Sequence, residues 1–173
     1  MRTLIRAVLS SPPLLFLTLA SPTTGQAQND EALVTYKSLK PSIALELAQA
    51  AQTECGEAGY QVAIAVTHRF GQVLVILRDQ FAGAHTVDTA TRKAWTAVSF
   101  RTATLELNDL IRENRAMARL GDITNALALG GGVPVRAAGT LVGGIGISGA
   151  PGADLDHDCA VKAIESIQDM LDF

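Results

Sequence analysis

Apolar and polar residues recur with helical spacing in four stretches of the chain. In the first stretch, Leu47, Ala48 and Ala51 fall on one side of a helix, and Gln49 and Gln52 on the other. Pro41 in the first turn and Gly59 just after the end support the same helix. The spacing predicts helices over residues 41–58, 86–100, 104–114 and 154–171.

Between the helices lie short runs that are rich in apolar and β-branched residues, which is typical of strands. Residues 60–67 and 72–78 flank a turn with Gly71, where a hairpin loop favours positive φ. Both runs are apolar nearly throughout, so we expect both of their faces to be covered. Further strands are predicted over 125–129, 134–137 and 141–148.

The order of these elements predicts the fold class. A chain that reads α-β-β-α-α-β-β-β-α favours an α+β domain with a mainly antiparallel sheet flanked by helices. The last strand contains Gly143, Gly144 and Gly146, which indicates close approach by a neighbouring backbone or a ligand. One domain accounts for the length after the leader.

The first 27 residues have the three parts of a secretory signal peptide. Arg2 and Arg6 precede a short apolar run over 14–20, and small residues follow at Gly25 and Ala27. The alternative is a membrane anchor, but this run is too short to span about 30 Å of hydrocarbon. We expect a signal peptide over 1–27, a polar lead-in over 28–40 and the domain over 41–173, in a periplasmic or secreted protein without stable membrane insertion.

Charge argues against nucleic acid as a partner. The whole chain has a net charge of −3. Removal of Arg2 and Arg6 with the leader leaves 12 basic and 17 acidic residues, a net charge of −5. An acidic protein has no general attraction for nucleic acid or anionic lipid.

Two cysteines, Cys55 and Cys159, are the candidates for a disulfide. An exported protein meets oxidising conditions, in which an even pair can form a bridge. Two separate buried thiols are the alternative, because free cysteine packs as a small apolar residue. Spacing along the chain does not decide between them.

Four ordered motifs resemble the GlcG/HbpS family. They are A-I-A-V-T-H-R-F-G-Q-V-L-V from residue 63, G-A-H-T-x-D-x-A-x-R-K-A-W-T-A from residue 83, G-G-G-V-P-V from residue 130, and V-G-G-I-G-I-S-G-A-P-G-x-D-x-D-x-x-C-A from residue 142. The resemblance covers about residues 41–173. It implies a profilin-like fold, assembly into homo-oligomers, haem as the ligand and, for some members, a sensor protein as partner.

His85 is the first candidate for a haem-iron ligand, because imidazole is a common axial donor. The alternative is that His85 only packs against or caps the helix that follows it. Arg78 before this histidine, and Arg92 and Lys93 after it, are candidates for pairing with haem propionates.

His68 marks a departure from the family pattern, which usually places Asp in the turn of the first hairpin. The imidazole there either adds a ligand or only changes the turn.

Two other functions stay open at this stage. In one, the protein is an enzyme of the isomerase or lyase type on a small organic acid, with His85 as acid–base group and Arg78 or Lys93 on a carboxylate. In the other, it is a scaffold or sensor partner without a small-molecule site.

Overall fold

Four antiparallel strands form one sheet in the order β2-β1-β4-β3 in the computed structural model, which describes residues 32–172. The strands are β1 (Ala63–His68), β2 (Val73–Arg78), β3 (Gly132–Ala137) and β4 (Thr140–Ser148). The β1–β2 and β3–β4 hairpins are joined through the β1–β4 pair. The predicted class, an α+β domain with an antiparallel sheet, is confirmed; the expected signal peptide lies outside the described residues.

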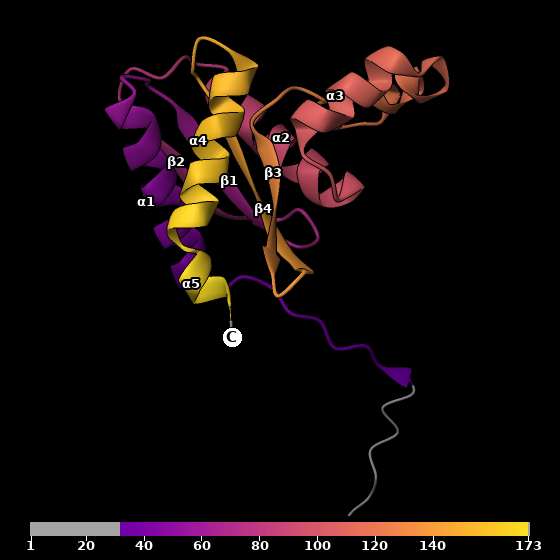
Figure 1. Cartoon of the computed structure of the whole chain (residues 1–173), viewed down its shortest axis with the longest axis horizontal. Coiled ribbons are helices and arrows are strands. Elements are labelled where there is room, and N and C mark those ends of the chain that lie inside the picture. The colour runs from indigo at the N-terminus through magenta and orange to yellow at the C-terminus, as the bar shows by residue number, and fades with distance from the viewer. Residues whose placement is uncertain (1–31, 173) are drawn as a thin grey trace, which may run out of the picture. The chain divides into compact units, whose positions relative to one another are not determined.

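Helices cover both faces of the sheet. Helices α1 (Pro41–Glu57) and α4 (Ala153–Ser166) pack side by side on one face, and α2 (Thr86–Phe100) lies on the other (Figure 1). None of the helices within residues 32–172 is long and apolar enough to cross a membrane. The remaining helical segments are α3 (Thr104–Glu113), η2 (Arg115–Asp122) and α5 (Gln168–Leu171).

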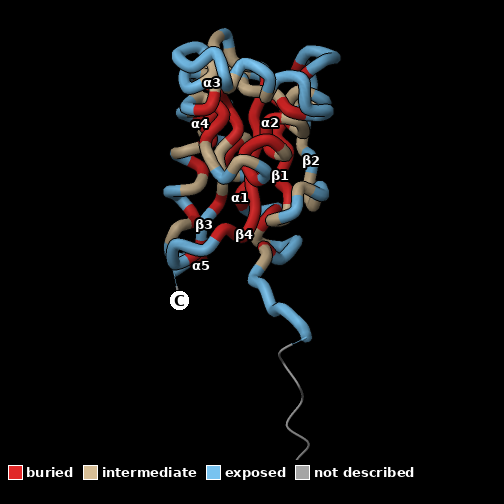
Figure 2. Tube along the Cα trace, turned by 90° about the vertical axis from the view of Figure 1, so that its right-hand side faces the viewer, coloured by how far each residue is buried: buried red, intermediate tan, exposed pale blue. Residues whose placement is uncertain are grey.

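The larger core lies between the sheet and the α1/α4 layer. Leu47 of α1, Ile64 of β1 and Ile145 of β4 are fully buried there, and β1 is buried from Ala63 to Thr67 (Figure 2). Cys55 of α1 and Cys159 of α4 form a disulfide across this layer, with their Cα atoms 5.6 Å apart. The structure thus decides the question that the sequence leaves open about these two cysteines.

The opposite face of the sheet is built from very small residues. Ala63, Ala65, Ala90 and Ala94 form a separate buried cluster between β1 and α2. A Cβ added to Gly146 of β4 would lie 2.0 Å from the Ala90 carbonyl oxygen. The glycines of β4 therefore let the backbone of α2 lie directly on the sheet, so the predicted close approach is made by a neighbouring helix.

The strand predicted over 125–129 is wrong. Asn125 has a φ of 72°, and the Leu127 N–H donates to the Thr96 hydroxyl of α2 at 2.9 Å. The Leu129 carbonyl accepts from the Thr104 hydroxyl at 2.6 Å. The backbone of this segment therefore forms hydrogen bonds with side chains of α2 and α3 and not with a neighbouring strand, so the segment is a loop.

The expectation that both faces of the first two strands are covered holds for β1 and is wrong for β2. Val73 and Ile76 are 41% and 43% exposed. Their partners in the β1 ladder, Thr67 and Ala65, lie under α2, whereas α2 packs mainly on β4, β1 and β3. An edge strand thus keeps one apolar face open, although its sequence reads like a buried strand.

The predicted lead-in and the predicted last helix also differ from the structure. Leu39, in the expected polar lead-in, is buried in the core, and its N–H donates to the Val142 carbonyl at 3.0 Å. The N-cap of α3 is Ala103, and the hydroxyl of Thr104, the first residue of that helix, bonds to the 129–132 loop. The predicted last helix is divided at Ile167 into α4 and α5.

Contact between α2 and β4 generates a prediction about two glycines. Gly146→Ala should destabilise the fold by about 1–3 kcal/mol or more, because the new methyl group overlaps the α2 backbone. Gly56→Ala in α1, where nothing lies within 4 Å of the added Cβ, should instead stabilise it by about 0.4–1 kcal/mol. Urea unfolding of both variants measures the difference, and equal effects would contradict the tight packing.

Candidate functional site

An open cavity of about 470 Å³ lies where the N-terminal ends of α2 and α4 meet the end of β4. Its wall includes His85, Arg92, Leu129, Ser148 and Pro151. The volume falls in the range of pockets that bind small ligands. The structure thus brings three of the predicted residues to one place, namely His85, Arg92 and Lys93.

His85 is the N-cap residue of α2, and its side chain makes no capping hydrogen bond. The first turn is held by Thr86, which is buried and donates from its hydroxyl to the Gly83 carbonyl at 2.7 Å. His85 itself is exposed at the rim of the cavity. Local structure therefore does not occupy the imidazole, which leaves a nitrogen available to a ligand.

Arg92 lies two turns further along α2 and supplies a partly exposed positive charge to the wall. Its guanidinium donates to the Ala126 carbonyl at 3.1 Å and lies 4.0 Å from the carboxylate of Asp88. The side chain is 38% exposed. Such a surface pair is weak, so the guanidinium keeps donors for an anionic ligand.

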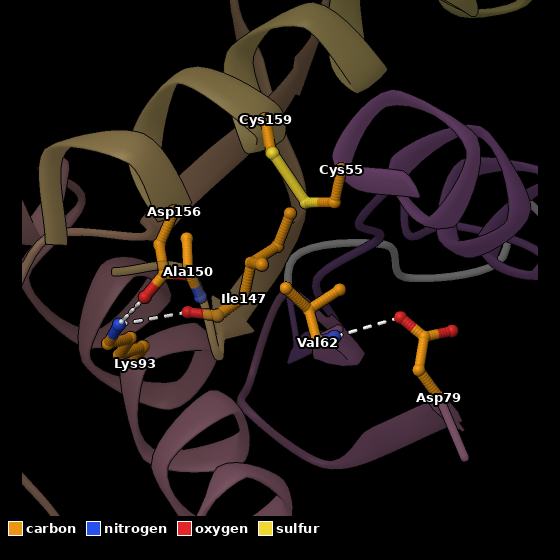
Figure 3. Close-up of a disulfide and its surroundings, with 8 residues drawn as sticks. All are labelled: Cys55, Val62, Asp79, Lys93, Ile147, Ala150, Asp156 and Cys159. Atoms are coloured by element: carbon orange, nitrogen blue, oxygen red, sulfur yellow. Dashed lines mark hydrogen bonds and ion pairs between the residues drawn. A yellow bond between two sulfur atoms is a disulfide. The ribbon is translucent and has the colours of Figure 1, made fainter. Parts of the chain in front are cut away.

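Lys93 differs from the free cation that the sequence predicts. Its side chain is 1% exposed, and Nζ lies 2.7 Å from a carboxylate oxygen of Asp156 on α4 (Figure 3). Nζ also donates to the Ile147 carbonyl of β4 at 2.9 Å. The ammonium group is buried and bound to these two acceptors, so we revise its role from a ligand of propionate to a support of the cavity floor.

Burial shifts the pKa values of both partners in this pair. Desolvation lowers the pKa of Lys93, and the charge and hydrogen bond of Asp156 oppose that shift. Desolvation raises the pKa of Asp156, opposed by Lys93 and by backbone N–H groups of Ala150 and Gly149. Each group therefore depends on the other to remain ionised in the interior.

The loop after β4 is positioned by the second oxygen of Asp156. The Ala150 N–H donates to this oxygen at 3.0 Å, and the loop from Ser148 to Gly152 forms one wall of the cavity. On the other side, a Cβ at Gly131 would lie 2.7 Å from the Asp156 Cβ and 3.0 Å from Lys93 Nζ. Gly131 thus makes room for the ion pair.

Two predicted residues lie away from this cavity. The guanidinium of Arg78 donates to the Ala82 carbonyl in the loop after β2, and Arg78 does not line the cavity. His68 lies in the β1–β2 turn, where its Nδ1 accepts from the Phe70 N–H at 2.9 Å. The imidazole therefore closes the turn, which is what a carboxylate could do at this position.

The residue that sequence reasoning missed is Asp156. It is not among the site residues that the sequence predicts, and it lies in the first turn of α4, whose N-cap is Gly152. Asp156 lies on the buried side of α4 with Cys159, Ala160 and Ala163. Asp156 recurs at helical spacing with these apolar residues. That pattern could have indicated a buried carboxylate with a partner, because buried carboxylates are paired.

Taken together, the cavity joins an unoccupied imidazole, a guanidinium and apolar walls above a rigid buried ion pair. The N-terminal ends of two long helices also face it, and both ends carry partial positive charge. These features suit a ligand that has an electrophilic centre or metal and an anionic group.

The family model described as "Haem degrading protein HbpS-like" matches residues 39–165. Among solved structures, the crystal structure of HbpS is similar to this chain with a TM-score of 0.75 and 37% identity, over 79% of this chain and 95% of that one. The crystal structure of a PduOC:Heme complex is similar with a TM-score of 0.68 and 30% identity, over 75% of this chain and 95% of that one.

Among curated proteins, the corrinoid adenosyltransferase PduO of Salmonella typhimurium is 32% identical over 124 residues. This match covers 70% of the present chain and 37% of PduO. A second PduO, from Citrobacter freundii, is matched over 43% of its length. The chain therefore spans less than half the length of these two relatives.

The buried ion pair generates a prediction about stability. Lys93→Met and Asp156→Leu should each cost about 3–5 kcal/mol, because each leaves one charge buried without its partner. The double variant Lys93→Met/Asp156→Leu should cost less than the sum of the two single variants. Urea unfolding at neutral pH measures all three.

Asp88→Asn provides the matched control, because Asp88 pairs with Arg92 at the surface. It should change stability by less than about 1 kcal/mol. If either single variant at the buried pair costs no more than this control, the pair does not support the cavity floor.

Proposed function

The chain belongs to the HbpS-like family of haem-degrading proteins, and we propose that it binds haem in the cavity between the N-terminal ends of α2 and α4. The observation that carries the proposal is the free imidazole of His85 in one cavity with the Arg92 guanidinium. The similar crystal structure of PduOC is a haem complex, and the match covers 75% of this chain.

The residues of the cavity fit the chemistry of haem. Leu127, Leu129 and Pro151 offer apolar wall for a macrocycle, and His85 offers an axial nitrogen. Arg92 is the cation that suits a propionate, because planar guanidinium groups bind carboxylates through two hydrogen bonds. When bound, haem would supply iron chemistry, while these residues hold and orient it.

Lys93 and Asp156 contribute to this site without contacting iron in the proposal. Their pair fixes α2 against α4 and, through Ala150, fixes the loop that forms one wall. A preorganised wall reduces the cost of ordering the site when a ligand binds.

An enzyme acting on a small organic acid is the second candidate. The specific observation in its favour is that two helix N-termini and Arg92 face one cavity, which suits a carboxylate. In that case His85 would be the acid–base group. A scaffold or sensor partner without a small-molecule site is the third reading, and it requires that the cavity bind neither class of ligand.

We further infer that the protein is exported and serves in haem sequestration or sensing. The leader pattern over 1–27 and the Cys55–Cys159 disulfide both support an oxidising compartment. A homo-oligomer and a sensor protein as partner belong to the same proposal. The exposed apolar side chains of Val73 and Ile76 on the edge strand β2 support association between copies.

Hemin titration tests the haem site. Addition of micromolar hemin to the mature protein should shift the Soret band. His85→Ala should weaken binding by at least about tenfold, since loss of even an outer partner costs a metal site 10–100-fold. His68→Ala is the matched control and should bind like the parent, because His68 lies in the hairpin turn.

The titration also separates the alternatives. A parent protein that gives no shift would contradict haem binding. Thermal stabilisation by a small organic acid in that same protein would then favour the enzyme, and its absence the scaffold. Equal loss in the two histidine variants would contradict the assignment of the axial nitrogen to His85.

Export generates a separate expectation. Expression of the full chain in a bacterium with an outer membrane should yield a protein that lacks about residues 1–27 in the periplasm or medium, with no free thiol. Mass spectrometry after fractionation and thiol labelling measures both properties. An uncleaved protein that retains two reactive thiols in the cytoplasm would contradict it.

A further inference from the structure

A second cavity, of about 260 Å³, lies at the other end of α2. Its wall comes from the β1–β2 turn, the C-terminal end of α2 and the start of β4. The lining residues are Arg69, Phe70, Val98, Ser99, Arg101 and Leu141. None of them lines the His85 cavity, so the two cavities are separate places on the domain.

This small cavity contains two arginines and no carboxylate. Within residues 32–172, neither Arg69 nor Arg101 takes part in an ion pair, so neither charge is neutralised. In an acidic protein this local excess of positive charge is an exception. Two uncompensated guanidinium groups on one concave wall favour an anion.

The Arg69 side chain is held by two aromatic rings, but one of its N–H groups lacks a hydrogen-bond acceptor. Its guanidinium carbon lies 5.5 Å from the Tyr36 ring centre and 5.2 Å from that of Phe70. These ring contacts hold the side chain through its face. Its Nε is buried and has no hydrogen-bond acceptor. A buried N–H without an acceptor is costly, and cation–π contacts do not remove that cost.

Arg101 has a backbone conformation that is unfavourable for a residue with a side chain. It is the C-cap of α2 with a φ of 57°, the left-handed region in which glycine is common at the end of a helix. Its carbonyl accepts from the Arg136 guanidinium at 3.1 Å. The helix dipole accounts for a cation at this end. It does not account for a second guanidinium, that of Arg69, on the same wall.

We propose that this cavity binds a small oxyanion, a carboxylate or phosphate group, between Arg69 and Arg101. The N–H fork of a guanidinium matches two oxygens of such a group, and the charge-assisted bonds would compensate the unneutralised arginines. The hydroxyl of Ser99 provides a further donor on the wall. The cavity volume of about 260 Å³ suits a small anionic group and not a macrocycle.

NMR titration of ¹⁵N-labelled mature protein tests the site, with inorganic phosphate and acetate added in separate series. The amide chemical shifts of Phe70, Ser99 and Arg101 should change and reach saturation at millimolar concentrations of the anion. A response to only one anion identifies the group that the cavity takes. Arg69→Gln and Arg101→Gln should each weaken binding by about tenfold or more, the loss expected when one charged hydrogen-bond partner is removed.

Arg115→Gln is the matched control, because Arg115 is exposed on η2, lines neither cavity and carries the same charge. It should leave the titration unchanged. Arg69→Lys retains the cation over the rings but loses the fork, and it should also bind more weakly. This variant covers the case in which Arg69→Gln does not fold.

Shifts that do not saturate with either anion, or that persist in both Arg69 variants, would overturn the proposal and leave Arg69 as a cation–π contact of the hairpin. Hemin binding should be unaffected by Arg69→Lys. The oxyanion site and the haem site therefore fail or hold independently.

Discussion

Lys93 and Asp156 meet where α2, the end of β4 and the start of α4 converge, and each has lost nearly all its water. The geometry compensates for that loss, because Nζ binds both Asp156 and the Ile147 carbonyl, and the second carboxylate oxygen binds the Ala150 N–H. Removal of one partner would leave a charge that the interior cannot solvate. The helices on opposite faces of the sheet are therefore tied together at one point, and the candidate haem cavity is built around it.

The pair forms where the backbone of α2 packs directly on the sheet. Gly146 and Gly144 of β4 leave no side chain under the helix, and Ala90 and Ala94 present little more than backbone. Gly131 lets the loop before β3 pass beside the pair, and Gly132 lets the start of β3 approach the backbone of α2 at Lys93. Small residues, which contribute little apolar area themselves, here determine where a charged side chain can reach its partner.

The two ends of α2 present different side chains to two separate cavities. Its N-terminal end presents His85 and Arg92 to an open cavity with apolar walls, whereas its C-terminal end presents Arg101 beside Arg69 in a smaller one. The first suits a flat ligand with a metal centre and carboxylates, and the second suits a small oxyanion. One rigid helix thus positions both sites, and the disulfide of the opposite layer supports the α4 end of the first.

Sequence alone determined the elements whose signals are local. The periodicity of residues 41–58, the Gly71 turn and the ordered motifs around His85 predicted the helices, the hairpin and the family, because each depends on neighbours a few residues away. Tertiary structure decided the rest. Lys93 and Asp156 are 63 residues apart, so no local pattern shows that they pair. The loop over 125–129 and the exposed face of β2 likewise depend on where α2 and α3 pack, and packing between distant segments is what decides which polar groups are satisfied and which strands are covered.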